Sequence, residues 1–169
     1  MGAHHEYTVA VSWPASGIEP GSPEAVTSSY TAYTRDHDVA LPGRPGIPGS
    51  ADPAFRGDPG RYSPEDLFVA SLSQCHMLWF LHLAAESGLA VREYVDDATG
   101  TMRVESRGEG QFTDVTLRPR VVVDPGPRAT DEHVADLHHR AHALCFLARS
   151  VNFSVIVEPA PLHVAEAAA

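Results

Sequence analysis

The chain has 169 residues, of which 43% are hydrophobic and 20% are charged, a composition typical of one globular domain. Its formal net charge is -10 with histidine neutral, and arginine supplies all of the positive charge because the chain contains no lysine. Neutralising the phosphates of nucleic acids or anionic membranes needs clustered basic residues, so we expect neither nucleic acid nor membrane as a partner.

The N-terminal sequence MGAHHEYTV lacks the basic segment and the apolar run of a secretory signal peptide, so we expect a cytoplasmic protein. The most apolar stretch, residues 67–85, is interrupted by polar side chains, and we interpret it as a core helix and not as a membrane span. In a reducing cytoplasm the two cysteines are expected to be free, catalytic or redox-active, not a permanent disulfide.

The first 62 residues predict two strands and a long loop. Hydrophobic side chains alternate over residues 6–14, which indicates a half-buried strand. Residues 28–40 are rich in tyrosine, threonine and valine and predict a second strand, which contains Arg35. Residues 41–62 hold ten glycines and prolines in 22 positions, so we expect a loop without regular structure that is either functional or a tolerated surface insertion.

Residues 63–88 predict the central helix of the fold. Ser63 is a typical N-cap, Pro64 suits the first helical position, and Asp66 completes a capping box with Ser63. Gly88 supplies the left-handed stop. The helix is apolar around most of its circumference and must be enclosed on most sides, so we expect a second copy of the chain as a partner.

The second half of the chain predicts further strands around a second helix. Strands are expected at residues 90–107, with a turn at Thr99-Gly100, at 111–123 and at 151–157. Residues 131–150 carry apolar side chains at three- and four-residue steps, which predicts an amphipathic helix with the second cysteine on its buried side.

The order of these elements predicts an α+β fold with antiparallel sheets, because the connections between strands are short. We expect a single domain over residues 1–169, in which residues 160–169 form a flexible tail.

The two cysteines, Cys75 and Cys145, allow two interpretations. Free cysteines are among the most buried residues, so both could be unrelated core side chains. Alternatively they form a dithiol pair at one site, in which one thiolate attacks and the other thiol resolves. A cysteine in the middle of a helix gains nothing from the helix N-terminus, so a nearby cation would have to stabilise its thiolate.

Arg35 is the best candidate for that cation, and Arg56 and Arg61 in the following loop are alternatives. Glu65 lies ten residues before Cys75, and ten helical steps bring the two side chains to within about 80° of each other around the axis. A carboxylate there could orient an arginine through a paired hydrogen bond, or it could only complement the helix dipole.

The ten histidines suggest a further hypothesis, a zinc site. His138, His142 and Cys145 share roughly one helical face, and His76 follows Cys75. However, His138 also fits the solvated edge of an amphipathic helix, and no second pair of ligands completes a closed site.

Two long stretches and one short one resemble the OsmC/Ohr family of thiol peroxidases. The family's central helix and following strand are similar to SPEDLFVASLSQCHMLWFLHLAAESGLAVREYVDDATGTM, and its second helix and last strand are similar to AHALCFLARSVNFSVIVEP. The early strand that carries the family's arginine is similar to the segment Arg35-Asp36-His37. The positions that match in the first helix are Pro64, Glu65, Leu67 and Cys75.

The resemblance implies an intertwined homodimer in which two long helices pack on antiparallel sheets. It implies that Cys75 takes an oxygen from an organic hydroperoxide to become a sulfenic acid and that Cys145 resolves it as a disulfide. Arg35 would stabilise the Cys75 thiolate and polarise the peroxide, and Glu65 would hold Arg35. No cofactor would be needed, because an external dithiol or lipoyl-type reductant would restore the thiols.

Three features depart from the family pattern. Phe146 follows Cys145 where many members have proline, His76 follows the first cysteine, and the loop at residues 41–62 is long. These departures place the chain in a divergent branch. The alternative function is therefore a non-catalytic redox sensor or small-ligand-binding protein with the same fold.

Overall fold

The computed structural model describes residues 2 and 4–166. The chain divides into two compact units, residues 1–67 and 68–169, and the long helix α1 (Pro64–Ser87) runs through the boundary. The expectation of a single domain stays a prediction, because two compact units joined by a helix do not decide whether they unfold together.

The first unit contains a small antiparallel sheet. Its three strands, in the order β1-β2-β3, are β1 (Ala10–Ser12), β2 (His37–Ala40) and β3 (Ile47–Gly49). The predicted strands at residues 6–14 and 28–40 are therefore too long. The alternating side chains Tyr7 and Val9 are 87% and 57% exposed, so no apolar face within this unit rewards extension of the strand.

The loop at residues 41–62 is more regular than predicted. It contains β3 and a 3₁₀ turn at Pro53–Phe55. The buried hydroxyl of Ser50 donates to the Asp36 carboxylate at 2.9 Å and accepts from the Asp58 backbone N–H at 3.0 Å. These contacts satisfy polar groups that a disordered loop would leave to water, so the loop is built around a buried serine.

The central helix α1 begins and ends where the sequence predicts. The Ser63 backbone N–H donates to the Asp66 carboxylate at 2.9 Å, and the Asp66 N–H donates back to the Ser63 hydroxyl at 3.1 Å, which is the predicted capping box. Gly88 has a φ of 77°, the left-handed conformation that ends a helix.

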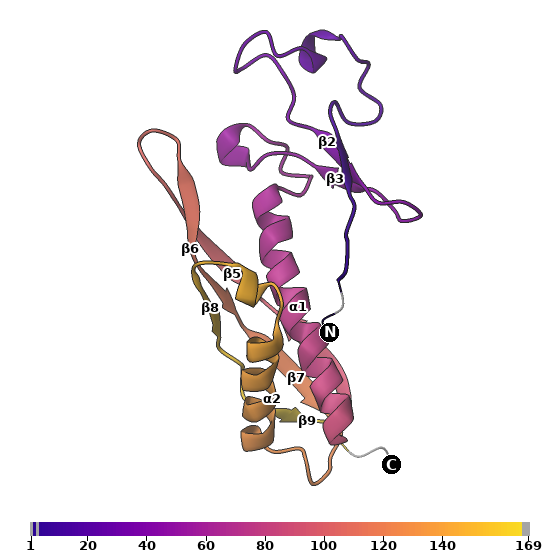
Figure 1. The fold of residues 1–169 in the computed structure, drawn as a ribbon, viewed down its shortest axis with the longest axis vertical. Helices are drawn as coiled ribbons and strands as arrows, with labels where there is room; N and C mark the ends of the chain where they lie inside the picture. The colour runs from indigo at the N-terminus through magenta and orange to yellow at the C-terminus, as the bar shows by residue number, and fades with distance from the viewer. Residues whose placement is uncertain (1, 3, 167–169) are drawn as a thin grey trace. The chain divides into compact units, whose positions relative to one another are not determined.

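The second unit places helices α1 and α2 against two mixed three-stranded sheets (Figure 1). One sheet has the order β4-β7-β9 and the other the order β5-β6-β8. Two of the pairings, β6 with β8 and β7 with β9, are parallel, and the other two are antiparallel. The bounds are β4 (Val91–Asp96), β5 (Thr99–Val104), β6 (Gly110–Leu117), β7 (Pro119–Val123), α2 (Asp131–Leu144), β8 (Ser154–Val157) and β9 (His163–Val164). The predicted α+β class is confirmed, but the sheets are not wholly antiparallel.

Two predicted strand boundaries are wrong. The strand predicted at residues 111–123 breaks at Arg118, and its halves β6 and β7 belong to different sheets. The turn predicted at Thr99-Gly100 lies between Asp96 and Thr99, because β5 begins at Thr99. Gly100 lies within β5, where an added Cβ would approach the side chains of Val69 and Phe112 to 2.7 and 2.8 Å, so this glycine serves close packing and not a turn.

Helix α2 is six residues shorter than predicted. It ends at Leu144, and Cys145 has a ψ of 111°, so the second cysteine is the C-cap and not a mid-helix residue. The predicted tail also carries structure, because β9 pairs with β7 and the Ala165 backbone N–H donates to the Val123 carbonyl at 2.8 Å. Residues 167–169 of that tail lie outside the described residues.

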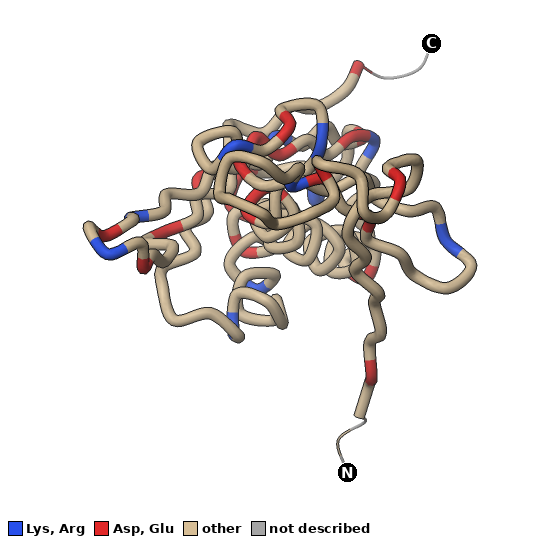
Figure 2. Tube along the Cα trace, turned by 90° about the horizontal axis from the view of Figure 1, so that it is seen from above, with Lys and Arg blue, Asp and Glu red and all other residues tan. Residues whose placement is uncertain are grey.

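The core of the second unit lies between the helices and the sheets. One cluster joins α1, α2 and β7, and a smaller one joins α1 to β6. By length and composition α1 is also long and apolar enough to cross a membrane, but its side chains are part of both clusters, as in the core helix of a globular protein. Over the described residues, arginines and acidic residues are intermixed and no strongly basic region stands out (Figure 2).

Candidate functional site

The thiols of Cys75 and Cys145 are 70 positions apart in the sequence, but they are neighbours in the structure. Cys75 lies in α1 and Cys145 at the end of α2, and both are free. The Cys75 side chain hydrogen-bonds with that of Cys145 and influences its ionisation. The structure thus brings the two cysteines side by side, and their role as a dithiol pair stays a prediction.

The Cys145 thiol is held in a buried turn. It is 1% exposed, and the Ala148 backbone N–H donates to its sulfur at 3.4 Å. Burial, together with the hydrogen bond that the Cys145 thiol donates to the Cys75 sulfur, raises the pKa of Cys145 to about 11, and the Ala148 N–H opposes this rise only in part. Cys145 is consequently a neutral thiol at pH 7.

Cys75 is the more accessible thiol of the pair, because it is half-buried whereas Cys145 is buried. A nucleophile that attacks a dissolved substrate must be reachable, and a resolving thiol need only reach its partner sulfur. The unequal exposure of the two sulfurs therefore favours Cys75 as the attacking residue.

Arg35 lies in the first unit, where its guanidinium is fixed by neutral groups. It donates to the carbonyl oxygens of Tyr33 and Tyr30 at 2.6 and 2.7 Å, and it lies 3.8 Å from the centre of the Tyr33 ring. Within the described residues no carboxylate lies within ion-pair distance of Arg35. Its positive charge thus remains available to an anion.

The alternative arginines differ from Arg35 in this respect. Arg61 lies 3.4 Å from the Asp36 carboxylate and 3.8 Å from that of Asp38, so two acidic groups already neutralise it. Arg56 is exposed and lies 3.5 Å from the Thr31 carbonyl oxygen. The structure therefore favours Arg35 on charge, and its role at Cys75 stays a prediction.

Glu65 lies in the first turn of α1, and the structure does not join it to Arg35. In the described part of the chain, its Oε2 atom is buried without a hydrogen-bond partner. Buried carboxylate oxygens are almost always paired with a donor, so this oxygen is a vacant acceptor for a guanidinium. Its predicted task of holding Arg35 remains untested.

A pair of buried histidines lies beside the thiols, and the sequence analysis missed it. His76 Nε2 and His138 Nδ1 are 3.1 Å apart, and the two side chains are 1% and 3% exposed. The prediction that His138 lies at a solvated helix edge is wrong. The available signal was its position four residues after Val134 and seven before Cys145, both of which are buried on the same face of α2.

Burial keeps both of these rings neutral. Desolvation, aided by His142, lowers the pKa of His76 to about 4, and desolvation with His76 lowers that of His138 to about 3. Among the described residues no group of three histidine, cysteine or acidic side chains is placed to hold a metal ion, so the zinc hypothesis on His138, His142 and Cys145 gains no support.

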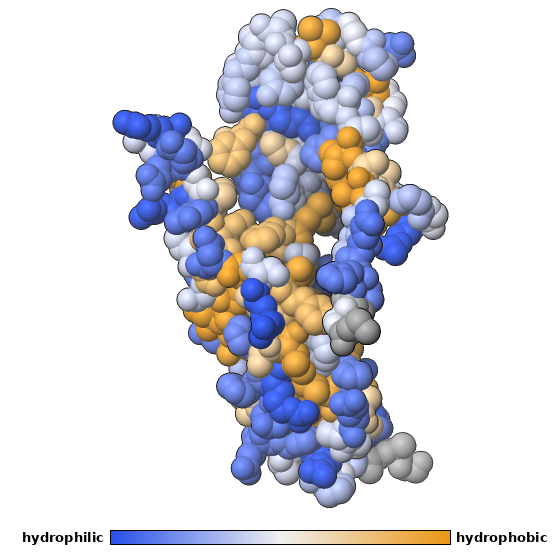
Figure 3. All heavy atoms as spheres, viewed as in Figure 1, coloured by the Kyte–Doolittle hydropathy of each residue, from blue (hydrophilic) through white to orange (hydrophobic). Residues whose placement is uncertain are grey.

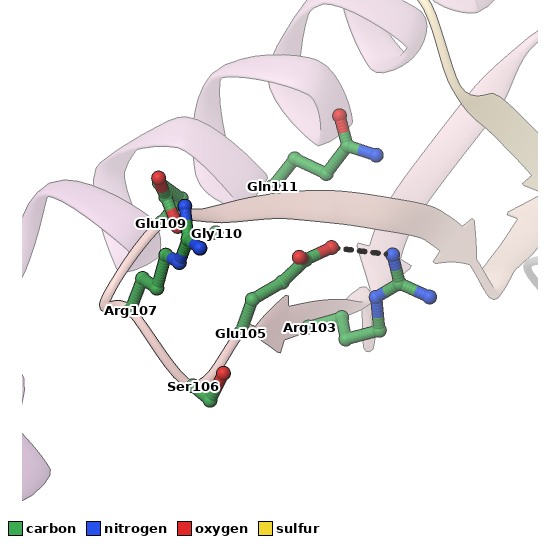
Figure 4. A pocket seen from close by; sticks show the side chains of 7 residues that line it. All are labelled: Arg103, Glu105, Ser106, Arg107, Glu109, Gly110 and Gln111. Atoms are coloured by element: carbon green, nitrogen blue, oxygen red, sulfur yellow. Dashed lines mark hydrogen bonds and ion pairs between the residues drawn. The ribbon is translucent and has the colours of Figure 1, made fainter.

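Two surface cavities lie elsewhere in the second unit. One of about 430 Å³ surrounds the turn between β5 and β6, where Arg103 pairs with Glu105 at 2.7 Å (Figure 4). The other, of about 400 Å³, is apolar and follows the end of α1 from Leu81 to Val91. Neither cavity is lined by a thiol or by a buried histidine.

The family model for OsmC-like proteins matches residues 57–159. The chain belongs to the OsmC-like protein family. No curated protein sequence matches it. The resemblance in the sequence is thereby confirmed, and the matched range includes Glu65, Cys75 and Cys145 but not Arg35.

Three solved structures of the OsmC-like family show the same fold. An OsmC-like protein of unknown function from Vibrio cholerae is 33% identical, with a TM-score of 0.77 over 93% of this chain and 100% of that one. An organic hydroperoxide resistance protein OsmC from Legionella pneumophila is 16% identical, with a TM-score of 0.62 over 96% and 100% of the two chains. An organic hydroperoxide resistance protein from Elizabethkingia anophelis is 20% identical, with a TM-score of 0.61 over 98% and 100%.

The buried histidines of this OsmC-like protein predict acid sensitivity. A group whose pKa is lower in the folded state than in the unfolded state takes up protons in the unfolded state at a higher pH. The free energy of unfolding is therefore largest above pH 6.5 and decreases as the pH falls toward the folded pKa. Each of His76 and His138 should contribute a slope of about 1.4 kcal/mol per pH unit below pH 6. Urea unfolding between pH 7 and 5 measures this slope.

The matched control for that measurement is His139→Gln, which alters an exposed histidine next to His138. This variant should keep the steep wild-type dependence. A wild-type unfolding free energy that stays constant from pH 6.5 to 5 would contradict the neutral buried pair.

Proposed function

We propose that this OsmC-like protein is a thiol-dependent reductase of organic hydroperoxides. The observation that carries the proposal is the contact between two free thiols of unequal exposure, Cys75 half-buried and Cys145 buried. An accessible attacking thiol beside a protected resolving thiol is the arrangement that two-cysteine peroxide chemistry needs. The names of the Legionella and Elizabethkingia structures, both organic hydroperoxide resistance proteins, support the same class of substrate.

In the first step the Cys75 thiolate attacks the outer oxygen of the hydroperoxide. A sulfur–oxygen bond forms as the oxygen–oxygen bond breaks, and the leaving alkoxide takes a proton to become an alcohol. Cys75 is thereby oxidised to a sulfenic acid.

In the second step Cys145 attacks the Cys75 sulfenic acid. The sulfur–sulfur bond forms, the hydroxyl group leaves, and it combines with the Cys145 thiol proton as water. Because the pKa of Cys145 is about 11, this thiol keeps its proton until the sulfenic acid is present, which limits its own reaction with peroxide. An external dithiol or lipoyl-type reductant then exchanges with the disulfide, so no bound cofactor takes part.

Arg35 and Glu65 supply the electrostatics of this proposal. Arg35 carries a charge that no carboxylate of the described residues neutralises, and the vacant Oε2 of Glu65 would fix the guanidinium. A guanidinium stabilises both a thiolate and the negative charge that develops on the peroxide oxygens.

We further propose a homodimer. Apolar residues gather over the region of α1 and α2 (Figure 3). Leu78 is 59% exposed on α1, and Phe146, 66% exposed, lies with its ring 5.4 Å from that of Trp79. A second copy of the chain would cover this apolar surface and enclose the helix, as the family resemblance implies. We also propose the cytoplasm as its compartment, because thiols that must be reduced again after each turnover need a reducing environment.

Removing the attacking sulfur should abolish peroxide reduction. With cumene hydroperoxide and dihydrolipoamide, Cys75→Ser should lose all turnover because no sulfenic acid can form. Cys145→Ser should react once, leaving a Cys75 sulfenic acid that dimedone labels. Equal peroxide consumption by wild type and Cys75→Ser would exclude the reductase and leave redox sensing or small-ligand binding.

Arg35 should be the arginine that matters for rate. Arg35→Met should lower kcat/KM about 100-fold, because preorganised charge at the reacting atoms is lost. Arg44→Met, at an exposed arginine of the same unit, should leave kcat/KM within about twofold. The arginine assignment is wrong if Arg56→Met or Arg61→Met causes the large loss and Arg35→Met does not.

The oligomeric state depends on the apolar surface around Phe146. Phe146→Asp should convert the dimer to a monomer, because a buried unpaired carboxylate opposes association. Val104→Asp alters an exposed apolar side chain on β5 and should leave the dimer intact. Light scattering after size-exclusion chromatography gives the mass, and a monomeric wild type at micromolar concentration would refute the proposal.

A further inference from the structure

Besides the apolar cluster between the helices, polar side chains of α1 meet polar side chains of α2 or of its C-cap Cys145 at three places among the described residues. The thiols of Cys75 and Cys145 meet at one level, and the rings of His76 and His138 meet next to it. The third contact lies at the far end of both helices, where His133 Nε2 is 3.0 Å from the Ser87 hydroxyl.

The histidine contact is closely connected to the thiols in the sequence. His76 follows Cys75 directly, and His138 precedes Cys145 by seven residues, which is two helical turns and returns to the same face. The side of α2 that presents His138 to α1 therefore leads on to Cys145, the C-cap residue, which lies next to Cys75.

The geometry requires a defined hydrogen bond between two neutral rings. Of the facing nitrogens, His76 Nε2 and His138 Nδ1, one must carry the proton and the other must accept it. In the described structure the outer nitrogens, His76 Nδ1 and His138 Nε2, are buried without partners. The pair therefore has a single internal hydrogen bond, and losing it would leave four buried nitrogens unsatisfied.

The surroundings hold the pair in place but offer it little else. Phe80 stacks on the His138 ring at 4.2 Å, and Tyr94 of β4 lies 6.4 Å from it. The titratable groups that the structure shows near the pair are His142 on α2, which helps to lower the pKa of His76, and Tyr94 on β4, whose own pKa burial and Asp96 raise. Asp96 itself accepts hydrogen bonds from Ser73 and the Arg118 backbone.

We propose that the hydrogen-bonded pair His76–His138 is a positioning element that holds Cys75 against Cys145 by tying α1 to α2 one residue beyond the first thiol. This inference rests on the proposed function of the two cysteines as a dithiol pair. The rings touch neither peroxide nor reductant. They fix the separation of the sulfurs and so set how readily the disulfide closes.

The direct test is the equilibrium between the Cys75–Cys145 disulfide and dithiothreitol, measured by alkylation of the reduced protein. His138→Leu fills the space without a hydrogen bond and should lower the effective concentration of the two thiols about tenfold. His138→Asn places an amide where Nδ1 lies, and because that amide can donate or accept, it should restore the equilibrium to within about threefold of wild type.

His133→Leu is the matched control. It removes another hydrogen bond between the same two helices, twelve residues from each thiol, and should leave the thiol equilibrium within about threefold of wild type even if the protein is less stable. The proposal is overturned if His138→Leu keeps the wild-type equilibrium, if His133→Leu shifts it as far, or if His138→Asn does not restore it.

His76→Leu removes the same hydrogen bond from the α1 side and serves if His138→Leu does not fold. The outcome is separate from that of the proposed function, because the equilibrium uses dithiothreitol and no peroxide. If the variants show the expected thiol equilibria but the wild-type protein consumes no hydroperoxide, only the proposal of a reductase is refuted.

Discussion

The candidate site depends on the packing of α1 against α2 through a face that carries polar side chains. Between these helices the fold buries the Cys145 thiol and the rings of His76 and His138, together with apolar residues such as Phe80 and Leu137. Apolar contacts alone tolerate small shifts of one helix along another, but a buried hydrogen bond does not, because the separated groups are left without partners. The same restriction that keeps the histidines together therefore keeps the sulfurs together.

Local signals were enough to predict the central helix from sequence. The capping box at Ser63 and the stop at Gly88 act through the backbone of their own few residues, so both ends of α1 were predicted correctly. The dithiol pair of Cys75 and Cys145 was one of two interpretations of the sequence, the family resemblance favoured it, and the fold brings both thiols together. Arg35 was selected for its place in a strand and Glu65 for its helical spacing from Cys75, and the resemblance supplied their roles. The structure contributes only an available charge and a vacant oxygen.

Contacts between distant residues decided the features that sequence did not predict. Helix α2 has no glycine or proline stop, and it ends where Cys145 turns into a buried position. Gly100 was predicted to lie in a turn, because the local sequence does not show that the side chains of Val69 and Phe112 pack closely against it. The His76–His138 pair joins residues 62 positions apart, and histidine is intermediate in its tendency to be buried, so residue type alone does not identify a core histidine.

The last two strands, β8 and β9, each pair with an earlier strand, and this limits how the C-terminus can be altered. Strand β8 covers an edge of β6, and β9 covers an edge of β7. A chain shortened after Pro159 would keep β8 but leave the edge of β7 without a neighbour, and unpaired edges are templates for aggregation. Residues 160–166, which look expendable in the sequence, therefore protect the sheet, so an affinity tag is better attached after them than in their place.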